Sequence, residues 1–101
     1  MTLGELISFL KKQDKNLVVP MGFCNPHSYR GYYEELAFEP KENVTIGEML
    51  KSAKSALDKT FVGYKGGDFT MDEYSTVNLA YYGHCGEAIG MVLLKYMVGE
   101  Y

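Results

Sequence analysis

The residues best suited to bind a ligand lie in the stretch His27-Ser28-Tyr29-Arg30-Gly31-Tyr32-Tyr33. It contains the only arginine of the chain, whereas the nine other cationic residues are lysines. A planar guanidinium pairs with phosphate or carboxylate through two hydrogen bonds and stacks on aromatic rings, which an ammonium group cannot do. With a serine hydroxyl and tyrosine rings beside it, Arg30 is suited to hold a phosphorylated or aromatic small molecule. Alternatively, the arginine stacks on its tyrosine neighbours as part of the structure.

A second candidate segment is Tyr64-Lys65-Gly66-Gly67-Asp68. Glycines let the backbone approach a ligand closely, exposed amides can bind an anion, and Lys65 adds a positive charge beside them. The segment does not match the phosphate-binding loop G-x-x-x-x-G-K-[ST], and a hairpin turn accounts for its glycines as well.

Together the two segments predict a nucleotide site, because each combines an aromatic ring with a cation. Arg30 and Lys65 would hold the phosphates, a tyrosine ring would stack on the base, and polar side chains would bond the ribose or the base edges. The candidate ligand-binding residues are Ser28, Tyr29, Arg30, Tyr32, Tyr64, Lys65, Gly66, Gly67, Asp68 and Asn78.

Metal binding and catalysis have weaker support in the sequence. Cys24 and His27 have a C-x2-H spacing, but the adjacent pair His84-Cys85 is an awkward second half for a zinc site. Glu34 and Glu35 are neighbours in an expected strand and point to opposite faces, so they cannot act on one substrate. No serine or cysteine nucleophile has a recognisable motif around it. We therefore predict a binding protein with no metal and no cofactor, and not an enzyme.

Composition limits the partners. The 101 residues predict a single domain over 1–101, and 47% hydrophobic residues are typical of a folded globule. A net charge of -3 argues against a nucleic-acid polymer as partner. No apolar run is long enough to span a membrane, and no leader is evident, so we expect a cytoplasmic protein with reduced cysteines.

Two similar tetrapeptides, T-L-G-E at residues 2–5 and T-I-G-E at residues 45–48, predict helix starts because each forms a capping box. Apolar residues follow each one at helical spacing. Between the helices, residues 17–23 predict a strand, with Pro20 at an edge or a bulge. Asn25-Pro26 predicts a turn within a loop that ends at residue 31.

The remaining strands are expected as follows. A strand from Tyr32 to Phe38 should end at the next proline, and residues 61–71 predict two extended pieces around a glycine turn. Residues 76–82 predict another strand, and the valine and tyrosine content of residues 89–98 favours a final one. The predicted fold is α+β: an antiparallel sheet of four to five strands with two amphipathic helices packed on one face. Sheet edges and a small core favour a homo-oligomer.

Three segments resemble small bacteriophage proteins: S-Y-R-G-Y-Y-E-E-L-A-F at residues 28–38, T-I-G-E-M-L at 45–50 and F-V-G-Y-K-G-G-D-F-T-M at 61–71. The nearest characterised group is the anti-Thoeris sponge family, which sequesters the cyclic ADP-ribose isomers that Thoeris defence systems use as alarm signals. The resemblance covers residues 28–82 and is not traced beyond Gly83. It implies an α+β homo-oligomer in the cytoplasm of an infected bacterium that captures a signalling nucleotide without cleaving it. Arg30 and the turn at residues 64–68 are the site residues that the resemblance carries over.

We therefore expect the protein to sequester a cyclic ADP-ribose isomer, and also cyclic oligonucleotides. The first alternative is a phage protein that binds and inhibits a host protein through a tyrosine-rich surface. The second is an enzyme that processes nucleotides.

Overall fold

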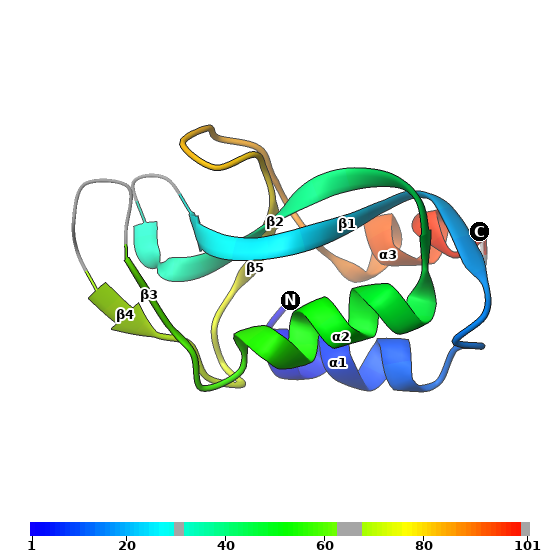
Figure 1. The fold of residues 1–101 in the computed structure, drawn as a ribbon, viewed down its shortest axis with the longest axis horizontal. Helices are drawn as coiled ribbons and strands as arrows, with labels where there is room; N and C mark the ends of the chain where they lie inside the picture. Colours follow the sequence, from blue (N-terminus) through cyan, green and yellow to red (C-terminus); the bar gives the residue numbers. More distant parts are fainter. Residues whose placement is uncertain (30–31, 63–67, 100–101) are drawn as a thin grey trace.

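The helices and strands of the chain form an α+β fold in the computed structural model (Figure 1). This confirms the predicted fold class. The structure describes residues 1–29, 32–62 and 68–99. The elements are α1 (Leu3–Lys11), β1 (Val18–Tyr29), β2 (Tyr32–Thr45), α2 (Ile46–Ala56), β3 (Thr60–Val62), β4 (Asp68–Thr70), β5 (Val77–Leu79), β6 (Glu87–Ala88) and α3 (Met91–Met97). A four-stranded sheet has the order β1-β2-β5-β6, and β3 and β4 form a separate two-stranded ribbon.

The capping boxes begin the first two helices. Thr2 Oγ1 accepts a hydrogen bond from the Glu5 amide at 3.2 Å, and the Glu5 carboxylate accepts one from the Thr2 amide at 2.9 Å. Hydrogen bonds from Thr2, chiefly from its backbone, hold the pKa of Glu5 below its ordinary value. Thr45 and Glu48 form the same pair of bonds at the start of α2. Both predicted helix starts are confirmed.

The core lies between the sheet and the helix layer formed by α1 and α2 (Figure 1). α2 packs against β1 and β2, and α1 packs against α2. At the centre of the sheet, the rings of Phe23 and Phe38 lie with their centroids 4.5 Å apart. The other large side chains that are fully buried include Leu3, Leu6, Leu10, Leu36, Ile46, Met49, Met71, Ile89 and Leu94.

The prolines do not interrupt the long β1–β2 hairpin, so the predicted turn at Asn25-Pro26 and the predicted strand end at Pro40 are wrong. β1 accommodates Pro26 in a bulge between Cys24 and Pro26, where Asn25 has a φ of 46°. Asparagine tolerates this left-handed conformation better than most residues. The pairing of β2 with β5 ends at Phe38, so Pro40 lies where only β1 adjoins β2. A strand tolerates a missing amide proton where one of its edges is free.

The sheet is mixed, whereas a wholly antiparallel sheet was predicted. β5 pairs in parallel with β2, through Val77–Leu79 and residues 36–38, and is shorter than the predicted strand at 76–82. Parallel neighbours need a long crossover. Here α2 and the β3–β4 ribbon supply it. The ribbon itself confirms the two extended pieces predicted within residues 61–71.

The segment predicted as a final strand is the helix α3. Leu94 and Met97 are buried at a spacing of three residues, while Val92 and Tyr96 are 66% and 69% exposed. The exposed apolar residues obscure the helical period, which is why the sequence pattern was misleading. Among the helices of the described residues, none is long and apolar enough to cross a membrane.

Candidate functional site

The strands that flank the two segments predicted to bind a ligand lie side by side. β3 contacts β1, and β4 contacts β2. The free ends of both hairpins, marked by Tyr29 and Tyr32 in one and by Val62 and Asp68 in the other, lie at the same end of the molecule, on the left of Figure 1. Strand ends about 30 residues apart in the sequence thus lie at the same end of the described structure.

Half of the ten predicted site residues lie outside the residues that the structure describes, namely Arg30, Tyr64, Lys65, Gly66 and Gly67. The backbone of Tyr32 begins β2, and Asp68 begins β4 with an exposed side chain. Ser28 lies opposite Leu36 on the core face of the sheet and is only 1% exposed. The serine hydroxyl therefore belongs to the packed interior, and direct contact with a ligand would require a change in that packing.

Tyr29 fastens the loop between β5 and β6 onto the sheet. Its hydroxyl donates to the Gly86 carbonyl at 3.2 Å and accepts from the Gly86 amide at 3.1 Å. The loop fits closely at this point, because a Cβ added to Gly86 would lie 1.9 Å from the carbonyl oxygen of Leu79. Glycine is thus required here by the close approach of two backbone segments. The predicted role of Tyr29 was to stack its ring on a base. In the structure its hydroxyl is engaged within the chain, and the residue is half-buried.

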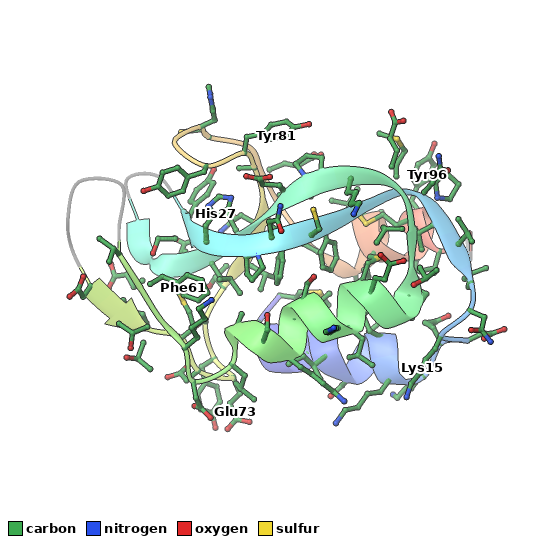
Figure 2. All side chains as sticks on the ribbon, in the orientation of Figure 1. Lys15, His27, Phe61, Glu73, Tyr81 and Tyr96 are labelled. Carbon is green, nitrogen blue, oxygen red and sulfur yellow. The ribbon has the colours of Figure 1, made fainter. Side chains whose placement is uncertain are left out.

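His27 forms a second anchor for the same loop, whereas its sequence spacing suggested only a role as a metal ligand. Its Nδ1 lies 2.9 Å from the Ser28 carbonyl oxygen, and its Nε2 lies 2.9 Å from that of Ala80. The ring also makes an edge contact with Tyr82 at 5.5 Å between centroids (Figure 2). Both ring nitrogens therefore face acceptors of the chain. Within the described residues, no three His, Cys, Asp or Glu side chains are placed to hold a metal ion.

Asn78 links β5 to β2 and is 4% exposed. Its Nδ2 donates to the Glu35 carboxylate at 3.1 Å and to the Leu36 carbonyl at 3.2 Å. Its amide protons thus have partners within the chain, in contrast to the predicted contact with a ribose or a base. The alternation of side chains along β2 shows on which face Glu35 lies. The contact with Asn78 depends on the parallel pairing of β5 with β2, and no local sequence pattern predicts that pairing.

The two cysteines are free thiols in the structure. Cys24 is half-buried on β1, and burial raises the pKa of its thiol. Cys85 lies exposed in the loop that Tyr29 fastens.

Exposed tyrosines are prominent on the described surface. Tyr74, Tyr81, Tyr82 and Tyr96 are between 51% and 75% exposed. Tyr81 begins the loop between β5 and β6 and is followed by Tyr82, whereas Tyr96 lies on α3 (Figure 2). Tyr74 lines a surface hollow with Thr2, Gly4 and Glu5 at the start of α1. The rings are therefore distributed over several surfaces.

Comparison of the chain with protein families, with curated proteins and with solved structures finds no match.

Proposed function

We propose that the protein is a phage anti-defence protein that binds a nucleotide-derived immune signal and sequesters it without cleaving it. One observation carries the proposal. The described strands that flank the two predicted binding segments contact each other, β3 against β1 and β4 against β2, and their free ends lie at the same end of the molecule. A nucleotide needs cations for its phosphates and a ring for its base, and Arg30, Lys65 and the neighbouring tyrosines would supply these groups at one end of the molecule.

The proposal includes the ligand class and the assembly. The resemblance of residues 28–82 to anti-Thoeris sponges favours a cyclic ADP-ribose isomer, with cyclic oligonucleotides as further candidates, and a homo-oligomer in the cytoplasm of the infected host. A sponge acts stoichiometrically, so binding must be tight and release slow. No catalytic residue and no cofactor is part of the proposal.

Calorimetric titration of the wild type, Arg30→Ala, Lys65→Ala and Lys11→Ala with these nucleotides tests the proposal. We expect tight binding by the wild type and a loss of at least about tenfold in each of the two site variants, because each removes a charge-assisted contact to phosphate. Lys11 lies exposed on α1, so Lys11→Ala is a matched control and should bind as the wild type does. Ligand released by heat should be chromatographically intact. Recovery of a cleaved product would show an enzyme, and equal binding by Arg30→Ala would remove the proposed site.

The exposed tyrosines favour a second candidate, a phage protein that inhibits a host protein. Tyrosine combines a large contact area with a hydroxyl and is enriched in protein interfaces. Pull-down from host lysate with the wild type, Arg30→Ala and a Tyr81→Ala, Tyr82→Ala double variant distinguishes the candidates. An inhibitor should keep its partner in Arg30→Ala and lose it in the double variant. A sponge needs no host protein for its binding.

A further inference from the structure

Lysines gather beside the outer face of α2, in a surface groove of about 530 Å³. The described residues that line it are Lys15, Gly47, Leu50, Lys51, Lys54 and Ser55. No carboxylate is among these lining residues, although the chain as a whole carries a net charge of -3. The groove therefore concentrates positive charge on an otherwise acidic protein, and it lies on the helix layer, not at the hairpin ends.

The helix and the turn before β1 position the three lysines. Lys51 and Lys54 are three residues apart on α2, so their Cβ atoms lie about 5–6 Å apart on the same face. Lys15 comes from the connection between α1 and β1, which is fixed to the first turn of α2 (Figure 2). The Gly47 amide donates to the Lys15 carbonyl at 3.0 Å, and the Ile46 amide donates to the Leu17 carbonyl at 2.9 Å.

The acidic residues nearest in sequence to these lysines form hydrogen bonds with other groups. Glu48 stands three residues before Lys51, a spacing suited to an ion pair, but its carboxylate accepts from the Thr45 hydroxyl at 3.0 Å within the capping box. The Asp14 carboxylate accepts from the Asn16 amide at 2.9 Å. Within the described part of the chain, none of the three lysines in the groove forms an ion pair.

The first amides of α2 are not available to an anion either. They donate to the carbonyls of residues 15 and 17 and to the Thr45 hydroxyl. Any anion at this groove must therefore be held by the lysine side chains themselves. A single carboxylate carries one negative charge, whereas a chain of phosphates carries several and so matches three lysines better in charge.

We propose that the groove at Lys15, Lys51 and Lys54 binds a polyphosphate group, either as inorganic polyphosphate or as the triphosphate of a nucleotide. The three ammonium groups would pair with successive phosphates, and the side chain of Leu50 would form an apolar wall. This site is separate from the one proposed at Arg30 and Lys65, and it does not depend on that proposal.

Two-dimensional NMR of the ¹⁵N-labelled protein, titrated at low salt with sodium tripolyphosphate, with ATP and with adenosine, tests this inference. We expect saturable binding of tripolyphosphate and ATP, no binding of adenosine, and shifts of the amides at residues 47–55. A Lys51→Gln, Lys54→Gln double variant should bind tripolyphosphate about 25-fold more weakly, since one charge pair at about 4 Å in water contributes roughly a factor of five.

The controls separate this site from general attraction to a cation-rich surface. A Lys11→Gln, Lys95→Gln double variant changes the net charge equally and should keep the wild-type affinity, and Arg30→Ala should keep it too. Tripolyphosphate binding that does not saturate, or that weakens equally in both double variants, would overturn the inference. Binding of ATP without tripolyphosphate would also overturn it, since recognition would then depend on the nucleoside.

Discussion

Gly86→Ala should disrupt the loop that Tyr29 holds against the sheet. The added Cβ would lie 1.9 Å from the Leu79 carbonyl oxygen and 2.8 Å from the Ala80 Cβ. Both neighbours are fixed, one in the backbone of β5 and the other directly after it, so the loop must move instead. Overpacking of this kind costs about 1–3 kcal/mol. Displacement would also break the two hydrogen bonds to the Tyr29 hydroxyl, each worth about 1 kcal/mol.

The expected loss in the free energy of unfolding is therefore about 3–5 kcal/mol. Urea unfolding followed by circular dichroism measures it. Gly90→Ala is the matched control, because nothing lies within 4 Å of the Cβ that it adds. Gly90 is the N-cap of α3, where alanine is disfavoured, so this control should cost at most about 1 kcal/mol.

A double-mutant cycle with Tyr29→Phe sharpens the test. Tyr29→Phe alone removes both hydrogen bonds and should cost about 1–2 kcal/mol. In the Gly86→Ala background it should cost much less, because the displaced loop has already lost those bonds. Our account of this anchor is refuted if Gly86→Ala costs no more than Gly90→Ala, or if the two changes are strictly additive.

Three further outcomes follow from the described side chains. His27→Phe should destabilise the protein by about 1–3 kcal/mol in urea unfolding, because two carbonyls lose the ring nitrogens that face them, whereas His84→Phe, in the exposed loop, should stay within about 0.5 kcal/mol. Asn78→Asp should cost more stability at pH 7 than at pH 4, because it places a carboxylate against another one; equal costs at both pH values would contradict the contact. At pH 8, iodoacetamide should alkylate Cys85 before Cys24, because burial raises the pKa of the Cys24 thiol and lowers its thiolate fraction; mass spectrometry of the peptides would reveal the opposite order.

Local signals predicted the first two helices and the β3–β4 ribbon well, whereas α3 was predicted as a strand. A capping box acts within four residues, so Thr2 and Thr45 are enough to place two helix starts. The sequence failed where a longer-range partner overrides a local preference. Asn25-Pro26 is typical of a turn, but β2 runs alongside it and turns it into a bulge. Likewise, the parallel position of β5 depends on the crossover, which no single segment encodes.

In the candidate site, too, the sequence predicted local features better than contacts between distant residues. Residue types drew attention to the stretch that begins at His27, and two of its residues, His27 and Tyr29, fasten the loop between β5 and β6. Sequence could not separate structural from binding roles within it, because the partners of His27 and Tyr29 lie more than 50 residues away. Asn78 was likewise predicted to contact a ligand, although its amide bonds to β2.

These structural roles determine which substitutions can test ligand binding. Changes at His27, Tyr29 or Asn78 alter anchors of the fold, so a loss of binding in such variants would not show that these side chains contact a ligand. Arg30→Ala and Lys65→Ala are informative only when their unfolding free energies equal that of the wild type. If the protein is a sponge, Arg30→Ala and Lys65→Ala should lose ligand binding and keep their stability, and the wild type should release intact ligand. A residue that only anchors the fold would instead lose stability when it is replaced.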